Sequence, residues 1–264
     1  MAAVLVTGGT GTLGAFVLLR LLAAGHRVRV LSRRADVSVP TGVQVVQGDL
    51  ASGAGLAQAV AGVGIVVHAA SDFTDPQATD VDGTARLIAA LEEAGGSPHI
   101  VGVSIVGVEG SSLPYYQAKR AAEQRLEASP LAWDVLRATQ FHGFALSVLD
   151  SLTDTDGVLT VPADIRLQPV AADDVAERLV QIATGAPGRL ISVFGGPQVL
   201  SLQAMGEAYR RAGGPVTSVR VSPVANPMLN AWRAGDHLIP EHPDGTVSWQ
   251  QFLEQRRHGP ERQR

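Results

Sequence analysis

Residues 7–14 read TGGTGTLG, and this short stretch decides the expected fold. An apolar run over residues 3–6 precedes it and a helical pattern over 12–24 follows it. Its glycines allow a tight turn and the close approach of a ligand to the backbone, while the helix start offers free N–H groups to a pyrophosphate. The stretch therefore predicts a strand, turn and helix that bind a dinucleotide. The other interpretation is a tight turn without a ligand. The expected cofactor-binding residues of the turn are Gly8, Thr10, Gly11, Thr12, Leu13 and Gly14.

Short β-branched runs and Ala/Leu-rich helical patterns continue to alternate after this turn. Further strands are expected over residues 27–32, 43–47, 65–69, 99–104 and 133–138. Helices are expected over residues 54–61, 80–94 and 115–128. Such alternation is typical of an α/β fold, here a Rossmann-type doubly wound parallel sheet.

The alternation loosens after residue 138. We expect residues 1–138 to form the dinucleotide-binding core and residues 139–264 to supply substrate-side segments and a small C-terminal cap packed on that core. Residues 165–195 are expected to return to the core. The remaining predicted elements are helices over 141–152, 173–184 and 202–212 and strands over 158–161 and 189–196.

Composition excludes several classes of function. With 45% hydrophobic and 17% charged residues, the chain is not intrinsically disordered. The absence of cysteine excludes disulfides and thiol nucleophiles, and no HExxH or paired histidines predict a metal site. A net charge of −4 argues against nucleic-acid binding, and the uncharged stretch 51–71 is too rich in glycine for a membrane span. We expect a soluble, cytoplasmic protein that acts on a small molecule.

The end of the second expected strand indicates the choice of dinucleotide. Ser32, Arg33 and Arg34 stand where an acidic residue would bind the ribose hydroxyls of NAD. Guanidinium groups instead suit the 2′-phosphate of NADP. NADPH is therefore the expected cofactor, with NAD left open. The other interpretation is that both arginines are a solvated pair in a loop.

Several segments together resemble the short-chain dehydrogenase/reductase superfamily, and more closely its atypical NmrA-like, NAD(P)H-binding branch. These segments are TGGTGTLG, RR at 33–34, GDL at 48–50, HAAS at 68–71, VSIVG at 103–107 and YYQAK at 115–119. The resemblance implies a nicotinamide cofactor with Asp49 and Leu50 near its adenine. It also implies that His68, Ala69 and Ala70 line the cofactor, whereas a lone histidine is more often a satisfied core residue.

Tyr115 and Lys119 stand four residues apart at the start of an expected helix, so they share one face. They match the family's YxxxK motif. A nearby ammonium favours phenolate over phenol, which suits proton exchange with a carbonyl or alcohol. Ser104 lies where the family has its carbonyl-orienting serine. The expected catalytic residues are therefore Ser104, Tyr115 and Lys119, against the alternative of a tyrosine that only packs in a helix interface.

The sequence departs from the family at Asp80, which stands where the NxxGT stretch has a relay asparagine. Further along the chain, residues 139–144 follow the sixth strand at the expected carboxyl end of the sheet, where open α/β sheets place ligands. Gln140, Phe141, His142 and Phe144 are therefore the expected substrate-pocket residues. Phe144 could equally belong to the core.

Three functions stay open at this level. The first is an NADP-dependent oxidoreductase that transfers a hydride to or from a carbonyl or alcohol, or an epimerase with the same chemistry. The second is an NmrA-like regulator that senses NADP(H) without catalysis. The third is a flavin or quinone reductase. A homodimer through the helices over 80–94 and 115–128 also stays open.

Overall fold

The computed structural model describes residues 2–224 and 226–258. The chain forms two compact units. The first contains the residues up to 104 together with 114–137 and 175–192, and the second contains 105–113, 138–174 and the residues from 193 onward. Residue 138, where the sequence predicts a domain boundary, is one of several points at which the chain passes from one unit to the other.

A seven-stranded sheet carries the dinucleotide-binding motif, and its strand order is β3-β2-β1-β4-β5-β6-β9. The pairs β1/β2, β1/β4, β2/β3 and β4/β5 are parallel. This is the Rossmann strand order, with the switch point between β1 and β4, so the predicted fold is confirmed. The strands are β1 (Ala3–Thr7), β2 (Arg27–Ser32), β3 (Gln44–Gln47), β4 (Ile65–His68), β5 (His99–Ile105), β6 (Ala132–Ala138) and β9 (Ile191–Phe194).

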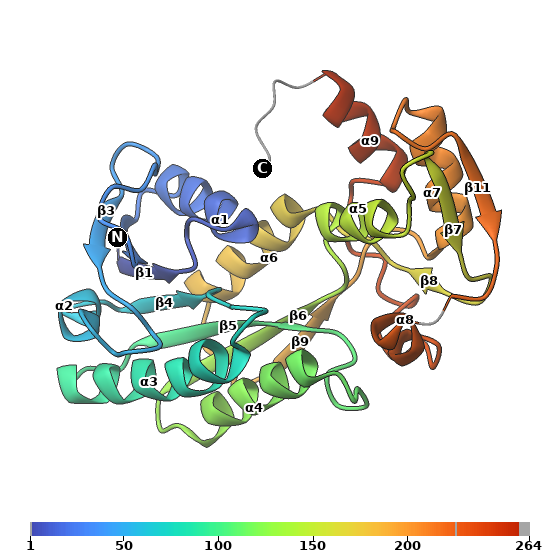
Figure 1. The fold of residues 1–264 in the computed structure, drawn as a ribbon. Helices are drawn as coiled ribbons and strands as arrows, with labels where there is room; N and C mark the ends of the chain where they lie inside the picture. The colour runs from blue at the N-terminus through green and yellow to red at the C-terminus, as the bar shows by residue number, and fades with distance from the viewer. Residues whose placement is uncertain (1, 225, 259–264) are drawn as a thin grey trace. The chain divides into compact units, whose positions relative to one another are not determined.

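Helices cover both faces of this sheet (Figure 1). They are α1 (Thr12–Ala23), α2 (Leu56–Val60), α3 (Gly83–Ala94), α4 (Pro114–Ala128) and α6 (Ala172–Thr184), and a π-helical segment η1 (Gln77–Asp82) leads into α3. Figure 1 shows α3 and α4 along one face and α1 and α6 along the other. Val4, Leu5 and Val6 are fully buried, as expected for strands covered on both sides.

The second unit has its own apolar core, which includes Leu149, Leu159, Ile165, Met205 and Trp249. Strand β7 pairs in parallel with β11, and β8 pairs antiparallel with β10. Its elements are α5 (His142–Ser151), β7 (Val158–Val161), β8 (Arg166–Leu167), β10 (Leu200–Ser201), α7 (Leu202–Arg211), β11 (Ser218–Val221), α8 (Pro227–Trp232) and α9 (Trp249–His258). Among the described residues, no helix has both the length and the apolar character that a membrane span needs.

Candidate functional site

The glycine turn between β1 and α1 has two kinds of glycine. Gly8 has φ +70°, and a Cβ there would lie 2.5 Å from the carbonyl oxygen of Ala69. A Cβ on Gly14 would lie 2.2 Å from the carbonyl oxygen of Gly8, so both positions need glycine for the turn itself. Within 4 Å, a Cβ on Gly11 would meet one atom of the described residues, that same Gly8 oxygen at 3.3 Å. The φ of Gly11, −86°, suits any residue. Of these three glycines, Gly11 is the one whose lack of a side chain packing explains least. A pyrophosphate close to the backbone would explain why glycine stands there.

The other expected residues of the turn are consistent with this role. Thr10, Gly11 and Thr12 are exposed at the start of α1, while Leu13 is buried. No side chain among the described residues caps this helix start, so its first N–H groups stay available to an anion. The turn therefore fits a dinucleotide phosphate.

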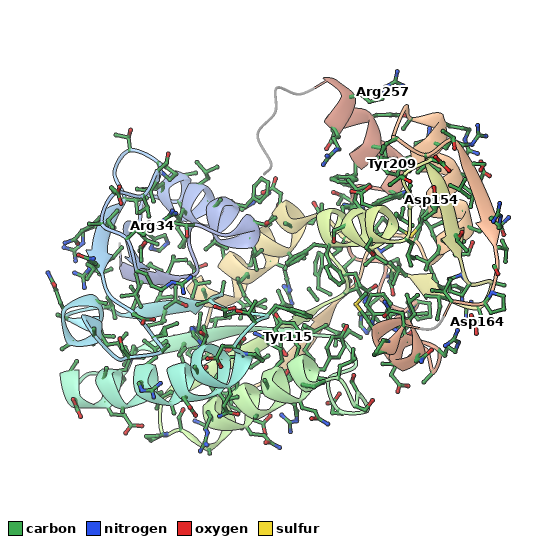
Figure 2. The ribbon with its side chains drawn as sticks, viewed as in Figure 1. Arg34, Tyr115, Asp154, Asp164, Tyr209 and Arg257 are labelled. Carbon is green, nitrogen blue, oxygen red and sulfur yellow. The ribbon has the colours of Figure 1, made fainter. Side chains whose placement is uncertain are left out.

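The loop after β2 presents two exposed arginines, Arg33 and Arg34. Arg34 is labelled in Figure 2. The side chain of Arg33 is 75% exposed, and its Nη1 lies 4.0 Å from Oδ2 of Asp72. The hydroxyl of Ser32 accepts a hydrogen bond from the backbone N–H of Arg34, which shapes the loop. Both arginines therefore directly follow the carboxyl end of β2, where the ribose of a dinucleotide would be bound.

Asp49 and Leu50 follow β3, the strand that pairs with β2. The carboxylate of Asp49 accepts a hydrogen bond from the N–H of Ala51 at 3.0 Å, and Leu50 is buried in the apolar core. Asp49 is only partly buried. Their expected place near the adenine stays a prediction.

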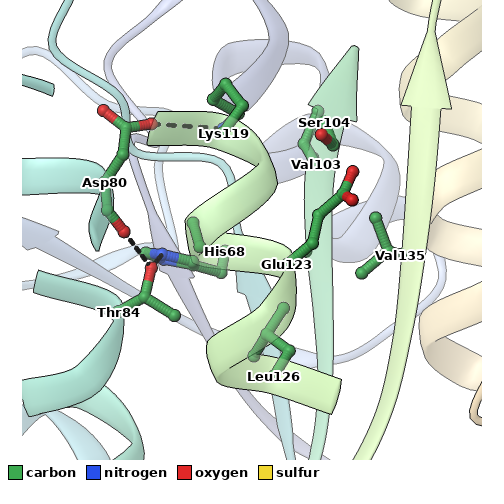
Figure 3. Close-up of a pocket in the computed structure, with 11 residues that line it drawn as sticks. His68, Asp80, Thr84, Val103, Ser104, Lys119, Glu123, Leu126 and Val135 are labelled. Carbon is green, nitrogen blue, oxygen red and sulfur yellow. Dashed lines mark hydrogen bonds and ion pairs between the residues drawn. The ribbon is translucent and has the colours of Figure 1, made fainter. Parts of the chain in front are cut away.

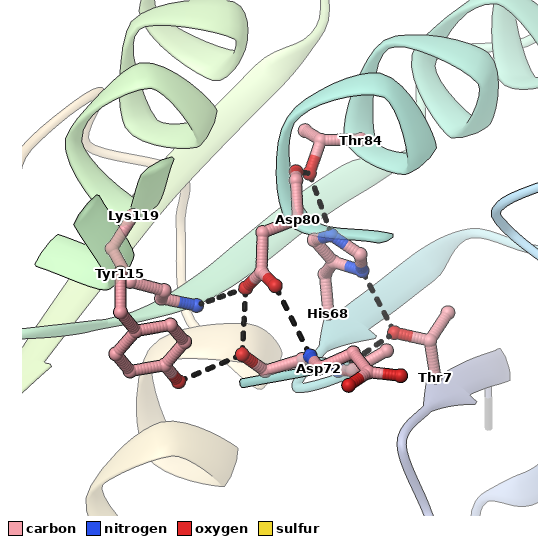
Figure 4. A network of polar contacts seen from close by, with 9 residues as sticks. Thr7, His68, Asp72, Asp80, Thr84, Tyr115 and Lys119 are labelled. Carbon is pink, nitrogen blue, oxygen red and sulfur yellow. Dashed lines mark hydrogen bonds and ion pairs between the residues drawn. The ribbon is translucent and has the colours of Figure 1, made fainter. Parts of the chain in front are cut away.

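His68 ends β4 and lies in a buried hydrogen-bond chain (Figure 4). Thr84 donates its hydroxyl proton to the Asp80 carbonyl, so its oxygen accepts from Nε2–H of His68 at 2.9 Å. Nδ1 is then the acceptor for the hydroxyl of Thr7, at 2.7 Å. Burial, followed by the nearby positive charge of Lys119, lowers the pKa of His68 to about 4. His68 is thus a neutral link in the structure rather than an acid–base group at neutral pH.

Asp80 collects the polar groups around Tyr115 and Lys119. Its side chain is fully buried in η1, and its Oδ1 accepts hydrogen bonds from Ser71 Oγ at 2.7 Å and Lys119 Nζ at 3.2 Å. Its Oδ2 accepts from the N–H of Asp72 at 3.1 Å. The hydroxyl of Tyr115 lies 2.8 Å from Ser71 Oγ (Figure 4). Asp80 therefore connects Lys119 to Tyr115 through one serine.

Asp72 is a half-buried acid in the loop next to this network. Hydrogen bonds from Thr74 lower the pKa of its carboxyl group, and the charge of Arg33 adds to the effect. The next residue, Phe73, is 70% exposed, and its ring centroid lies 5.0 Å from that of Tyr115. The loop after β4 thus places an exposed aromatic ring beside the candidate proton donor.

Ser104 lies near the end of β5 and lines a small pocket with Lys119 and Glu123 (Figure 3). It is 4% exposed, and its Oγ has no hydrogen-bond partner among the described residues. The carboxylate of Glu123 is held by Nε and Nη2 of Arg137 at 2.8 and 2.7 Å, so it is committed to a buried ion pair. The hydrogen bonds among the described residues thus join Tyr115 to Ser71 and include none from the side chain of Ser104.

The four expected substrate-pocket residues lie in the second unit. Gln140 is buried, donates to the carbonyl of His237 and accepts from the N–H of Gln168. Phe141 precedes α5 and is half-buried, whereas Phe144 is 40% exposed. His142 is buried with both ring nitrogens unpaired among the described residues. Gln140 and His142 are thus committed to their own unit, and the pocket role of all four stays a prediction.

Sequence reasoning missed Ser71 as a functional candidate. Asp80 was visible as a departure from a family motif, but the partner that it holds was not. The segment HAAS brings Ser71 next to the expected cofactor residues, and that position is its one sequence signal. Ser71 and Tyr115 are 44 positions apart in the sequence and come together only in the folded chain.

The chain is similar in sequence to a protein family and to characterised proteins. A family model described as NAD(P)H-binding matches residues 8–185. A (4-alkanoyl-5-oxo-2,5-dihydrofuran-3-yl)methyl phosphate reductase from Streptomyces griseus is 32% identical over 219 residues, which cover 81% of this chain and 75% of the relative. Photosystem II assembly factor Ycf39 of Trieres chinensis is 30% identical over 161 residues, 56% of this chain and 50% of that relative.

A solved structure also shares the fold. The NADPH-dependent quinone oxidoreductase of Escherichia coli, complexed with NADPH, matches with a TM-score of 0.80 at 17% identity. The match covers 97% of this chain and 100% of that chain.

Proposed function

The chain belongs to the NAD(P)H-binding family, and from this premise we propose that it is an NADPH-dependent reductase of a small carbonyl compound. The predicted enzyme class, an NAD(P)-dependent oxidoreductase, is confirmed by the family match and by the named reductases. Beyond this class, we propose that the enzyme prefers NADPH and reduces a carbonyl group with residues of the site described above.

In this proposal the glycine turn and the arginine loop hold the cofactor. The start of α1 binds the pyrophosphate, and Gly11 allows its close approach. Arg33 and Arg34 bind the 2′-phosphate. When bound, NADPH supplies a hydride.

Tyr115 supplies the proton in this reaction, and its position carries the proposal. Tyr115 and Lys119 share one face at the start of α4, and the phenol is held by a hydrogen-bond network that ends on the buried Asp80. A phenol fixed in this way can pass its proton to the oxygen of a carbonyl while a hydride reaches the carbon. Ser104 lines the same pocket as Lys119 and has no hydrogen-bond partner in the described part of the chain, so it is the candidate second donor to that oxygen.

One observation favours a regulator that binds NADP(H) without catalysis. The ammonium of Lys119 is paired with the carboxylate of Asp80, which offsets the positive charge that favours phenolate at Tyr115. The relative Ycf39 is named as an assembly factor rather than as an enzyme. We keep this alternative second, because Tyr115 and Lys119 are both present and connected.

Removal of the Tyr115 hydroxyl tests the proposal. A panel of aldehydes, ketones and quinones is screened by NADPH absorbance, and Tyr115→Phe should lower turnover of any accepted substrate by roughly 10²-fold or more, the usual scale of general-acid catalysis. NADPH affinity should stay within about twofold, because the hydroxyl does not hold the cofactor.

Tyr116→Phe is the matched control, because Tyr116 is the neighbouring residue and points about 100° away around the helix. It should turn over normally. Reversed effects of the two variants would mean that Tyr116 is the acid. The absence of NADPH consumption across the whole panel would favour the regulator.

The cofactor preference has its own test. Arg33→Ala/Arg34→Ala should lose NADPH affinity by about 1.5–3 kcal/mol for each contact to the 2′-phosphate, while NADH affinity changes little. Arg27→Ala, at the exposed start of β2, is the matched control. Titration calorimetry measures all three proteins. Equal affinity of the unmutated protein for NADPH and NADH would contradict the assignment.

A further inference from the structure

The phenol of Tyr115 has a serine as its hydrogen-bond partner, and this serine is Ser71 rather than the expected catalytic residue Ser104. Ser71 follows β4, and its Oγ lies 2.8 Å from the Tyr115 hydroxyl. Ser104, near the end of β5, is 4% exposed and has no hydrogen-bond partner among the described residues. The two serines therefore differ in what they do for the tyrosine.

The contacts of Asp80 fix the direction of the hydrogen bond between Ser71 and Tyr115. Each contact of the carboxylate is to a donor: the hydroxyl of Ser71, the ammonium of Lys119 and the N–H of Asp72. Ser71 has one hydroxyl proton, and it donates this proton in its hydrogen bond to the carboxylate of Asp80. The oxygen of Ser71 therefore accepts from Tyr115, and the phenol proton points toward Ser71.

Asp80 also holds Ser71 in place. Its side chain is 0% exposed, and its two oxygens bind a hydroxyl and a backbone N–H from consecutive residues after β4. The same Oδ1 binds Lys119 on α4. The loop after β4 and the first turns of α4 thus bind the same buried carboxylate (Figure 4). We expect this arrangement to limit the rotation of the Tyr115 side chain.

We propose that Ser71 is the positioning residue for Tyr115, with Asp80 as its anchor. This inference rests on the proposed function, because positioning matters only if Tyr115 transfers a proton. Ser71 keeps the phenol in one orientation until a carbonyl oxygen replaces it as the acceptor of the phenol proton. Ser104 is then free to bind the substrate oxygen instead of the tyrosine.

The experiment compares Ser71→Ala, Ser71→Thr and Ser104→Ala by a measurement that does not depend on turnover. The chain has three tyrosines, so ¹³Cζ-labelled tyrosine gives three resonances, and Tyr115→Phe identifies the one from Tyr115. Ser71→Ala should move this resonance because the phenol loses its acceptor. Ser71→Thr should restore it, since threonine keeps the hydroxyl, and Ser104→Ala should leave it in place.

Kinetics on a carbonyl substrate of the wild-type enzyme give the second measurement. Ser71→Ala should lower kcat by about tenfold, the effect of one lost hydrogen bond, with KM and NADPH affinity nearly unchanged. Ser71→Thr should recover most of kcat. Ser97→Ala, an exposed serine before the amino end of β5, controls for the loss of a serine hydroxyl and should behave as wild type.

Two results would overturn the proposal while the proposed function survives. One is an unmoved Tyr115 resonance in Ser71→Ala, which would mean that the contact is absent. The other is a moved resonance with unchanged kcat, which would mean that the contact does not position the acid. If wild type reduces no carbonyl, or Tyr115→Phe reduces it normally, the proposed function fails and the positioning role fails with it. The resonance then still shows whether the Ser71 contact exists.

Discussion

Two buried histidines, one in each compact unit, are kept neutral in different ways. His68 lies in the first unit, and both of its ring nitrogens are hydrogen-bonded, to Thr7 and Thr84. His142 lies in the second unit, 2% exposed, with both ring nitrogens unpaired among the described residues. Its ring stacks on Phe252 at a centroid distance of 4.8 Å and an interplanar angle of 12°. Burial is the main reason why both pKa values fall to about 4.

The two histidines therefore have similar pKa values but different roles. His68 transmits a directed chain of hydrogen bonds from Thr7, beside the glycine turn, to Asp80, which holds Ser71 and Lys119. His142 behaves as an aromatic ring of the second core. A perturbed histidine pKa indicates a functional site only when the polar partners of the ring lead to one.

The largest expected effect on stability comes from breaking the His68 chain. His68→Leu removes two buried hydrogen bonds and leaves the hydroxyl proton of Thr7 without its acceptor, which should cost about 3 to 5 kcal/mol in the free energy of unfolding. Thr7→Val breaks the same chain at its other end and should also destabilise, by about 2 kcal/mol. Urea denaturation at pH 7 measures both. A loss below about 1 kcal/mol in His68→Leu would remove the distinction between the two histidines.

The second effect is on the pH dependence of stability. The unfolded chain takes up protons as the pH falls through 6.5, the ordinary histidine value, whereas folded His68 and His142 stay neutral until about pH 4. The unfolded state thus binds more protons in this window, so the free energy of unfolding falls from about pH 6.5 to pH 4 and levels off below it. Each of these histidines should contribute on the order of 3 kcal/mol. Burial also lowers the pKa of His237, which acts in the same direction.

Denaturation curves at several pH values between 7 and 4 check this expectation. His68→Leu and His142→Phe should each remove the contribution of one histidine to the fall in the free energy of unfolding between pH 7 and pH 4. The double variant should remove both, because the two residues lie in different units. A wild-type protein whose stability stays constant across this window would contradict the assignment.

The sequence predicted the first unit far better than the second. The glycine turn and the alternation of apolar runs gave β1, α1 and β2 almost to the residue, because their signals are local. The pairing of β7 with β11 brings together residues about sixty positions apart, and nothing near either strand predicts it. Strand β11, helix α8 and helix α9 were not predicted, since Pro-rich and polar segments carry little periodicity.

In the candidate site, too, residues with local sequence signals were predicted and residues defined by long-range contacts were not. Tyr115 and Lys119 follow from helical spacing, and Gly8, Gly11 and Gly14 from the turn that they make. Ser71 could not be found in this way, because its role depends on a carboxylate nine residues away and a phenol 44 residues away. The aromatic partners of His142 are still further away in the sequence.

The smallest effect comes from His142→Phe, which keeps the ring and removes its two unpaired nitrogens. Phenylalanine has nearly the same shape, so the stack on Phe252 and the neighbouring Trp249 should persist. A buried polar atom without a partner costs free energy, so its removal should stabilise the protein by about 1 kcal/mol at pH 7. The gain should grow toward pH 4. In this range the unfolded wild-type chain binds a proton at His142 and the folded protein does not, so wild type loses stability and His142→Phe does not. Denaturation of both proteins at pH 7 and pH 5 measures it, and a loss of stability at both values would show that the nitrogens of His142 make polar contacts after all.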